Sequence, residues 1–393
     1  MKIALVNSYY NPDVIGGAEI IVELLAKGLS EKGHEVKVFC SSPSILDESQ
    51  DKIHIHRDKI ANIYWPPAMV SPGSIQKGIW HLLNLYNPFS AKRIVCYIKE
   101  FAPDIIHLHN ISIFTSALYS ELQKHFSETP IVQTLHDYWH ACIKNTLLHG
   151  NGDICVNRPG LCSLRSSFII DKAQVIKKFV SPSLFLKEYY IKESLISKQR
   201  IEVIPNALPR LVNKKEQIKE KNQKISFVYI GQLETHKGIN VLLEAIRRVK
   251  KHSKIEFIFA GKGRLENLVK KEAHIKYLGY ISGQEKERIL SSGDVLFLPS
   301  QWYENYPLVG IEACNHGMAI IGSRIGGIPE IVTDGWNGKL LEPGNANQLT
   351  IAIESVTRND SLLRKWQQNS LKFAEKFNLD TMIDRYLALY RSL

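Results

Sequence analysis

The sequence predicts an α/β protein of two Rossmann-like domains that face each other across a cleft. In residues 1–205, short apolar runs typical of buried strands alternate with amphipathic helical stretches. The same alternation returns in residues 206–375, after a proline-containing, charged tract at 203–224 that is typical of an interdomain linker. Because strands that alternate with helices form parallel sheets with helices on both faces, each half is expected to hold its own sheet.

The first half opens with a predicted strand at 2–8, a helix at 18–33 and a second strand at 34–42. Gly33 suits the left-handed position that ends many helices. Two further apolar runs, "PDIIHLHN" and "PIVQTLHD", end in polar residues. Ligands of such sheets bind beyond the carboxyl ends of the strands. The polar residues expected at that edge are His107, His109, Asn110, His136 and Asp137.

The second half repeats the pattern, with one strongly amphipathic helix at 238–252. Its expected strands are 224–232, 254–263, 275–282, 293–300 and 318–327. The last stretch, "TMIDRYLALYRSL", is an amphipathic helix that must bury its apolar face. We expect residues 376–393 to pack back on the N-terminal domain.

Composition bounds the class of protein. The 393 residues are 44% hydrophobic and 23% charged, and no apolar run reaches the 18 or so residues of a membrane-spanning helix. The first apolar run, "IALV", is too short for a signal peptide, so we expect a cytoplasmic protein. A position at the inner face of the cell membrane stays an alternative. Six cysteines in a chain of this length do not make a disulfide framework.

The charge is unevenly distributed. The net charge is +11, and residues 206–393 carry 28 Lys and Arg against 20 Asp and Glu. A basic half favours phosphates, nucleic acid or an anionic membrane as partners. No nucleic-acid-binding motif is present, so no nucleic-acid partner is expected. Basic residues between Lys214 and Lys276 either touch an anionic membrane or form a solvated surface. The sequence does not predict an oligomeric state.

The stretch "SQWYENYPLVGIEA" at 300–313 predicts an anion site. Proline is favoured at the first position of a helix, so Pro307 is expected there with Tyr306 as the cap. The amides of residues 308–310 then point outward at the positive end of the helix dipole and suit a phosphate. Glu304 precedes this helix and Glu312 lies inside it. Two carboxylates around a phosphate site match a nucleotide sugar, although an ordinary solvated helix start is the alternative.

Other segments favour the nucleotide-sugar interpretation. Lys237 immediately precedes a predicted helix start at Gly238, where it can neutralise a phosphate. The pairs Gly16-Gly17 and Gly326-Gly327 either let the backbone approach a ligand or form tight turns. A dinucleotide-dependent oxidoreductase is excluded by its missing fingerprint, because no G-x-G-x-x-G follows the first strand.

An ordered set of motifs runs nearly end to end. They are "GGAE", "DIIHLHN", "TLHDYWHAC", "VIPN", "GQLETHKG", "GKG", "SGDVLFLPS", the E-x7-E pair Glu304 and Glu312, "GGIPEIV" and "DGWNG". Together they resemble glycosyltransferase family 4, retaining enzymes of the GT-B architecture. The family often has arginine where this chain has Gln232, and its "EGFG" is "ENYP" here, with Pro307 unable to donate an N–H.

The resemblance implies that residues 206–375 bind a UDP- or GDP-sugar and residues 1–205 an acceptor. It implies that Glu312 holds the ribose, Glu304 faces the transferred hexose and Lys237 stabilises the diphosphate, with His136 as a further catalytic residue. The implied donor-binding residues are Gly17, Gly231, Gln232, Lys237, Tyr280, Ile281, Asn305, Tyr306, Pro307, Leu308 and Glu312, with base contacts near Tyr280–Ser282. The implied acceptor-side residues are His109, Asn110, Asp137 and Tyr138.

The predicted function is a retaining, metal-independent hexosyltransferase that glycosylates a hydroxyl of a glycan or lipid-linked acceptor in cell-surface polysaccharide synthesis. We expect front-face displacement, in which the departing phosphate oxygen takes the acceptor proton. The sequence has no Asp-x-Asp motif, and no cofactor is expected to be required. Two alternatives stay open: a non-catalytic nucleotide-sugar-binding protein and a nucleotide-sugar epimerase of the same fold.

Three further features of the sequence are weaker indications of function. Cys142, His149, Cys155 and Cys162 either hold zinc, with a spacing that matches no common site, or are reduced loop residues. The histidines that follow the predicted strands suit hydrogen bonding to sugars better than a metal. The aromatic and apolar segment 63–89 packs on a lipid-linked acceptor, dips into a bilayer surface or is an irregular insertion.

Overall fold

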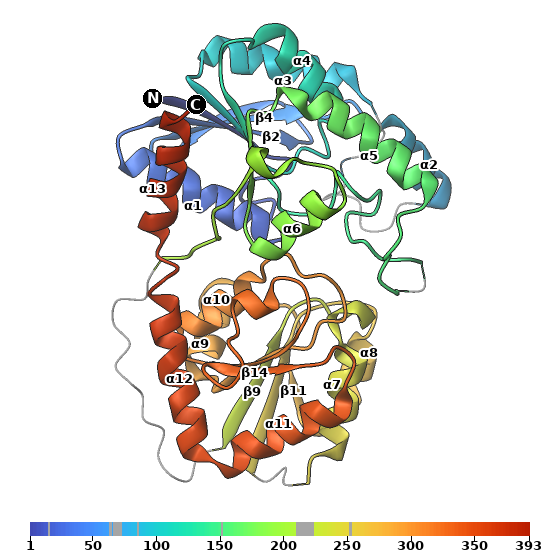
Figure 1. Cartoon of the computed structure of the whole chain (residues 1–393), viewed down its shortest axis with the longest axis vertical. Coiled ribbons are helices and arrows are strands. Elements are labelled where there is room, and N and C mark those ends of the chain that lie inside the picture. Colours follow the sequence, from blue (N-terminus) through green and yellow to red (C-terminus); the bar gives the residue numbers. More distant parts are fainter. Residues whose placement is uncertain are drawn as a thin grey trace. The chain divides into compact units, whose positions relative to one another are not determined.

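The computed structural model describes residues 1–14, 16–62, 65, 73–84, 86–150, 152–209, 224–250 and 254–393. The chain divides into two compact units, whose elements are labelled in Figure 1. The first unit comprises Met1–Thr146, Asn157–Asn206 and Leu379–Leu393, and the second comprises Leu147–Val156 and Ala207–Asn378. Most of the predicted linker, residues 210–223, lies outside the described residues.

The first unit is built on an eight-stranded sheet of order β3-β4-β2-β1-β5-β6-β7-β8. All neighbouring pairs are parallel except β3 with β4. The apolar runs of β1, β5 and β6 are buried, as expected for strands covered on both faces. The strands are β1 (Lys2–Val6), β2 (Glu35–Ser42), β3 (Leu46–Gln50), β4 (Ile53–Lys59), β5 (Ile105–Leu108), β6 (Ile131–Thr134), β7 (Lys178–Ser181) and β8 (Ile201–Val203).

Helices from distant parts of the chain complete the first unit. They are α1 (Gly17–Glu31), α2 (Ser74–Leu83), α3 (Pro88–Phe101), α4 (Ala117–His125), α5 (Gly160–Lys172), α6 (Leu184–Lys192) and α13 (Leu379–Arg391), with 3₁₀ turns η2 (Ala173–Val175) and η3 (Lys198–Arg200). Helix α13, from the end of the chain, packs on α1 so closely that a Cβ added at Gly28 would lie 1.8 Å from Cδ1 of Ile383. Gly33 has φ 81° just beyond α1, as its position predicted.

The second unit has a six-stranded, all-parallel sheet of order β11-β10-β9-β12-β13-β14. Its strands are β9 (Ile225–Ile230), β10 (Ile255–Ala260), β11 (Ile275–Tyr277), β12 (Val295–Leu298), β13 (Ala319–Ser323) and β14 (Gly338–Leu341). Three phenylalanines from neighbouring strands stack in its core, with Phe227 and Phe297 rings 5.4 Å apart. This repeated α/β pattern confirms the predicted fold class of two Rossmann-like domains.

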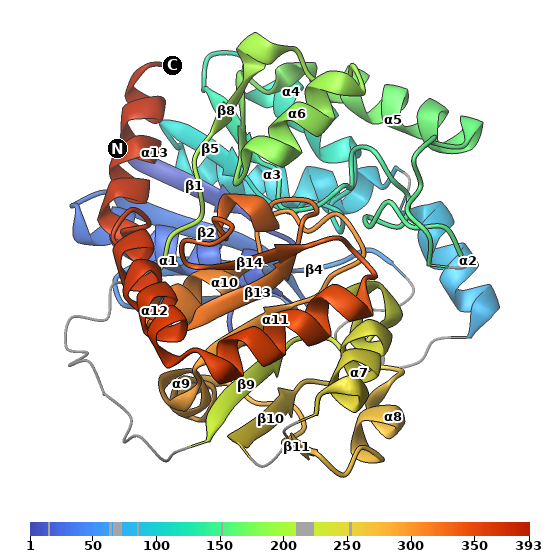
Figure 2. The ribbon, with the colours of Figure 1, turned by 60° about the horizontal axis from the view of Figure 1, so that its bottom comes forward.

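The helices of the second unit are α7 (Ile239–Arg248), α8 (Glu266–Lys270), α9 (Gly283–Ser292), α10 (Leu308–Asn315), α11 (Ala346–Arg358) and α12 (Asp360–Ala374), with 3₁₀ turns η4 (Thr235–Lys237) and η6 (Ile328–Glu330). Helices α7 and α11 lie side by side, as Figure 2 shows. Strand β11 ends at Tyr277, short of the predicted 282. The Leu278 N–H still donates to the Phe259 carbonyl of β10, but Gly279 has φ 75°, which turns the chain out of the extended conformation.

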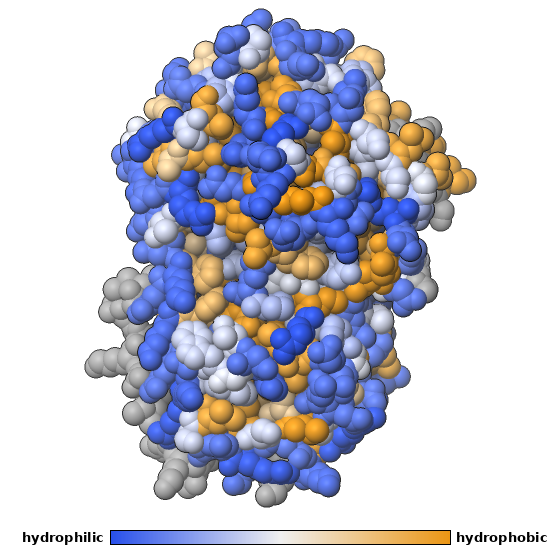
Figure 3. Space-filling view, viewed as in Figure 1, coloured by the Kyte–Doolittle hydropathy of each residue, from blue (hydrophilic) through white to orange (hydrophobic). Residues whose placement is uncertain are grey.

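None of the described helices is long and apolar enough to cross a membrane. Of the segment expected to meet a lipid, residues 63–64, 66–72 and 85 lie outside the described residues. In Figure 3, which keeps the view of Figure 1, apolar side chains gather on the surface of the first unit around α2 and α5. They include the exposed Ile75 and Ile79 of α2 and Leu161 and Leu164 of α5.

Candidate active site

Glu304, in the loop between β12 and α10, is buried in the second unit and held by two donors. Its Oε1 accepts hydrogen bonds from Lys237 Nζ at 2.8 Å and from Ser300 Oγ at 2.6 Å. Burial by itself would raise the pKa of Glu304, but the Lys237 charge and these hydrogen bonds hold that pKa below its usual value. The carboxylate is therefore ionised at neutral pH, in contact with the lysine that the sequence singled out.

The backbone around Gly238 positions Lys237. Gly238 adopts φ 77°, and a Cβ added there would lie 1.8 Å from the carbonyl oxygen of Pro299. This close approach brings the turn η4 against the end of β12, where Glu304 follows a few residues later. The Lys237 ammonium also lies 4.6 Å from the centre of the Trp302 ring. Lys237 is thus held between an aromatic face and a carboxylate.

The pair Gly326-Gly327 packs against the Glu304 loop. The Gly327 N–H donates to the Glu304 carbonyl at 2.6 Å, and a Cβ on Gly327 would lie 2.2 Å from the Asn305 carbonyl oxygen. A Cβ on Gly326 would lie 2.4 Å from the Glu304 carbonyl. These glycines therefore allow two backbone segments to meet where a side chain would not fit.

Glu312, in α10, is bound by a lysine that sequence reasoning missed. Lys286 Nζ lies 2.7 Å from Oε1 and 2.6 Å from Oε2 of Glu312. Lys286 lies in the first turns of α9, just after the expected base-binding segment Tyr280–Ser282. Each glutamate of the E-x7-E pair is therefore paired with a lysine. No motif or spacing indicated Lys286, because its contact depends on how α9 and α10 approach each other.

The start of α10 differs in detail from its prediction. The helix begins at Leu308 with Pro307 as its N-cap, so the expected cap at Tyr306 is wrong. Pro307 adopts an extended ψ of 108°, and Tyr306 is buried with its ring 6.0 Å from that of Phe377. The prediction that all three first amides point outward is also wrong, because the Gly310 N–H donates to the Pro307 carbonyl at 2.9 Å.

Two amides at this helix start keep the properties of an anion site. No side chain caps α10, and the N–H groups of Leu308 and Val309 have no acceptor within the described ranges of the chain. Backbone N–H groups without partners at a helix start attract anions through the helix dipole. The described contacts therefore include a helix terminus and two lysine–carboxylate pairs within one unit.

The remaining predicted donor residues of the second unit lie in loops after its strands. Gly231 and Gln232 follow β9, where the Tyr229 hydroxyl donates to the Gln232 carbonyl at 2.7 Å. A Cβ at Gly261 would lie 1.8 Å from the Gly231 carbonyl oxygen, so the loops after β9 and β10 touch. Before α9, Tyr280 is exposed and Ile281 is buried.

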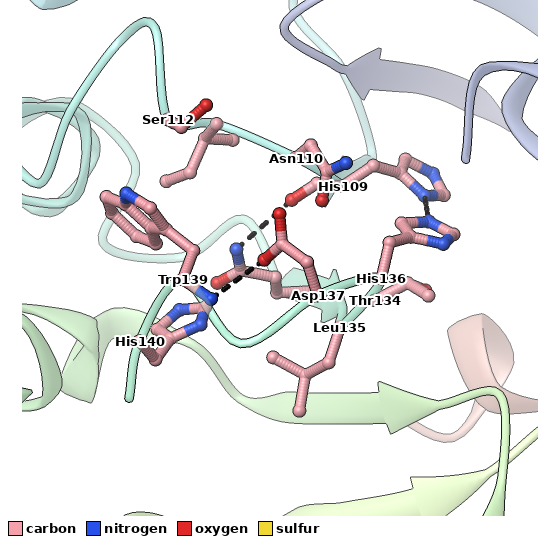
Figure 4. Close-up of a pocket in the computed structure, with 11 residues that line it drawn as sticks. His109, Asn110, Ser112, Thr134, Leu135, His136, Asp137, Trp139 and His140 are labelled. Atoms are coloured by element: carbon pink, nitrogen blue, oxygen red, sulfur yellow. Dashed lines mark hydrogen bonds between the residues drawn. The ribbon is translucent and has the colours of Figure 1, made fainter. Parts of the chain in front are cut away.

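In the first unit, predicted residues after β5 and β6 line a small cavity, shown in Figure 4. His109 Nδ1 lies 2.9 Å from His136 Nε2. Asp137 accepts a hydrogen bond from the Trp139 N–H at 2.8 Å, and burial raises the pKa of its carboxyl to about 6. The lining residues are His109, Asn110, Ile111, Ser112, Gln133, Thr134, Leu135, His136, Asp137, Trp139 and His140.

Two predicted residues of the first unit lie outside that lining. Tyr138 is fully buried, with its ring 5.3 Å from Tyr189. Gly17 is the first residue of α1, whose N-cap Gly16 donates its N–H to the Glu19 carboxylate at 2.8 Å. Tyr138 is thus a core residue, and the glycine pair forms a helix start closed by Glu19.

Burial keeps the histidines near the cavity neutral. It lowers the pKa of His136 to about 4 and that of His140 to about 3. The pKa of His109 lies well below its ordinary value for the same reason, with smaller contributions from His107 and His136. At neutral pH these rings therefore exchange hydrogen bonds as uncharged imidazoles.

Within the described residues, no group of three or more His, Cys, Asp or Glu side chains is arranged to hold a metal ion. Cys142 is buried, and Cys155 and Cys162 are half-buried free thiols. The His149 N–H donates to the Asp153 carbonyl at 2.8 Å, which closes a small hairpin. The four residues considered for zinc do not form such a group.

Comparison with protein families identifies the chain. Residues 15–209 match the model for Glycosyltransferase Family 4, and residues 212–373 match that for Glycosyl transferases group 1. The chain belongs to glycosyltransferase family 4. The predicted resemblance is confirmed.

Relatives of this family 4 chain extend over its whole length. An uncharacterized 42.6 kDa protein in the cps region of Klebsiella pneumoniae is 29% identical and covers 100% of both chains. The O-antigen chain mannosyltransferase C of Escherichia coli is 23% identical over 100% of this chain and 99% of its own. Sucrose-phosphate synthase from Thermosynechococcus elongatus has a TM-score of 0.77 at 19% identity, covering 100% of this chain and 98% of its own. The fold is that of the GT-B glycosyltransferases.

Proposed function

We propose that this family 4 chain is a retaining hexosyltransferase that takes a hexose from a UDP- or GDP-sugar. The proposed acceptor is a hydroxyl of a glycan or of a lipid-linked saccharide. The observation that carries the proposal is the pair of lysine–glutamate contacts, Lys237 with Glu304 and Lys286 with Glu312, formed around the start of α10. Carboxylates accept hydrogen bonds from sugar hydroxyls, and the amides of the helix start suit a diphosphate.

Lys237 is the proposed partner of the leaving diphosphate. Its ammonium has three N–H donors, and Glu304 accepts one of them at 2.8 Å. The other two can donate to phosphate oxygens, so the ion pair orients the ammonium and leaves donors for the diphosphate. As the bond between the anomeric carbon and the phosphate oxygen breaks, negative charge grows on that oxygen. A positioned cation and the dipole of α10 stabilise this charge without a metal.

The proposed reaction proceeds on one face of the sugar. The acceptor oxygen forms a bond to the anomeric carbon, the bond to the diphosphate oxygen breaks, and that oxygen takes the acceptor proton. The chain contributes positioning and electrostatic stabilisation. Glu304 is proposed to orient the hexose and Glu312 the ribose. His136 is the proposed contribution of the first unit to catalysis, and His109, Asn110 and Asp137 are its proposed acceptor-side residues.

Relatives support the choice of pathway and donor. The E. coli relative is named for O-antigen chain synthesis, and the Klebsiella relative for the cps region. A structure of similar fold, Anabaena HepE, was determined with UDP; it has a TM-score of 0.71 at 16% identity and covers 100% of both chains. We therefore propose a role in cell-surface polysaccharide synthesis with a nucleotide-diphosphate donor.

A ligand panel followed by product analysis tests the proposal. Thermal shift with UDP, GDP and ADP and their hexoses should show strong stabilisation by one nucleotide family, since a ligand stabilises the state that binds it. Incubation of that donor with candidate lipid-linked saccharides should give a glycoside with the anomeric configuration of the donor, read by NMR. An inverted product would refute the retaining mechanism. Sugar isomerisation without acceptor would favour the epimerase, and binding without any turnover would favour the non-catalytic protein.

A further inference from the structure

A buried histidine of the first unit joins the C-terminal helix to the sheet. His107, in β5, has no exposed surface. Its Nδ1 lies 2.6 Å from the Tyr390 hydroxyl of α13, and its Nε2 lies 2.8 Å from Thr134 Oγ1 of β6. Thr134 Oγ1 lies 3.1 Å from the hydroxyl of Tyr386, one turn before Tyr390 on α13. Both ring nitrogens of His107 therefore have hydroxyl partners.

The His107 ring leads on to the histidine that we propose as catalytic. The centres of the His107 and His109 rings lie 4.1 Å apart with an interplanar angle of 36°. His109 in turn bonds to His136 across 2.9 Å, the contact drawn in Figure 4. A continuous array of rings and hydroxyls thus runs from Tyr390, at the end of the chain, to His136.

The number of N–H protons on neutral histidines decides which groups of this array donate and which accept hydrogen bonds. A neutral imidazole carries one N–H, so of the two hydroxyls on His107 one donates to the ring and the other accepts from it. Burial lowers the pKa of His107 to about 3, so the ring stays neutral. Between His109 Nδ1 and His136 Nε2 there is also a single proton, which makes the two tautomers dependent on each other. The His109 ring lies against the His107 ring. When His107 is fixed by its two hydroxyl partners, it therefore holds the His109 ring in the orientation that bonds to His136.

We propose that His107 and Tyr390 are positioning residues that hold His136 in one orientation and one tautomer through His109. The inference rests on the catalytic role proposed for His136. It assigns to α13 a function beyond packing: the last turn of the chain completes the hydrogen-bonding around β5 and β6 in the first unit. Residues that orient a catalytic residue without contacting the substrate commonly affect the chemical step more than substrate binding.

Tyr390→Phe tests the proposal, because it removes one hydroxyl and keeps the ring. We expect kcat to fall about tenfold with the KM for the donor within about twofold. The matched control is Asp384→Asn on the same helix. Asp384 accepts from Lys32 Nζ at 2.6 Å, its side chain is 61% exposed, and it takes no part in the hydrogen bonds of the array. The control should keep the wild-type kcat.

Nitrogen NMR of histidine-labelled protein gives a readout that does not depend on activity. The wild type should show single tautomers for His109 and His136, and Tyr390→Phe should show mixed or exchanging tautomers. Thr134→Val removes the other hydroxyl that contacts His107, at similar side-chain volume. It should give the same result and replaces Tyr390→Phe if that variant does not fold.

Wild-type tautomers and wild-type kcat in a folded variant would overturn the inference. If the wild type transferred no sugar, the proposed function would fail, and unchanged tautomers would separately refute the positioning role.

Discussion

The Lys286 ammonium contacts both carboxylate oxygens of Glu312, at 2.7 and 2.6 Å. Both side chains are about one-fifth exposed, so the pair is largely screened from solvent and part of it is still accessible to a ligand. Each carboxylate oxygen has two lone-pair directions, so one lysine that contacts both oxygens does not use all the acceptor capacity of Glu312. Lys286 therefore orients the glutamate proposed to bind the nucleotide.

This pairing predicts that Lys286→Met weakens donor binding without slowing the chemical step. We expect the Kd for the preferred nucleoside diphosphate, measured by titration calorimetry, to rise about fivefold to tenfold, with kcat at saturating donor unchanged. Lys270→Met is the control, since Lys270 pairs with Glu266 on the exposed surface of α8. Combining Lys286→Met with Glu312→Gln should cost less than the sum of the two changes, because the residues act together. Full additivity would contradict the coupling.

The contact between Lys237 and Glu304 predicts that Lys237→Ala lowers the turnover rate more than it weakens donor binding. Without the cation, the charge that grows on the leaving phosphate loses its partner, and kcat should fall by about a hundredfold or more with donor saturating. Lys237→Arg should recover part of the loss, because it keeps the charge but changes its shape. Initial rates with labelled donor measure both variants. Near-normal turnover by Lys237→Ala would remove the leaving-group role.

The turn at Gly238 predicts a large effect of a single methyl group. In Gly238→Ala the new Cβ would meet the Pro299 carbonyl at 1.8 Å in addition to the strain of φ 77°. We expect the free energy of unfolding of the second unit to drop by about 3 kcal/mol or more. Gly335→Ala separates the two causes, because Gly335 has φ 74° but nothing within 4 Å of an added Cβ. That variant should lose about 1 kcal/mol in urea denaturation. Equal losses in the free energy of unfolding for the two variants would show that the backbone moves away from the new Cβ of residue 238 at little cost.

The neutral histidines of the first unit predict acid sensitivity. Burial lowers the pKa values of His107, His109, His136 and His140, so between about pH 4 and 6.5 the unfolded chain binds more protons than the folded one. Stability should therefore fall as the pH drops below about 6.5. Asp137, whose pKa burial raises to about 6, acts in the opposite direction over part of this range.

Thermal unfolding between pH 7.5 and 5 measures this effect. The Tm should decrease steadily below pH 6.5, and His140→Phe, which removes one buried titrating ring, should show a shallower decrease than the wild type. A flat Tm across this range would mean that the rings titrate alike in the folded and unfolded chain.

Local patterns were enough to predict the fold class and to indicate several candidate site residues. Alternation of apolar strands and amphipathic helices predicted both parallel sheets, since burial on two faces produces continuous apolar runs. Glu304, Lys237 and Glu312 were identified by their places around helix starts. The antiparallel strand β3 escaped prediction because its residues are exposed and polar.

The sequence by itself determined that two Rossmann-like domains form and that the E-x7-E glutamates lie on either side of a helix start. Only the tertiary structure decided which partners they meet: Lys286 reaches Glu312 from another helix, and Tyr390 reaches His107 across 283 positions of the chain. Strand and helix periods record which side of an element is buried. Partners of a buried polar group depend on which elements the completed sheet order brings together, and no local period encodes that order.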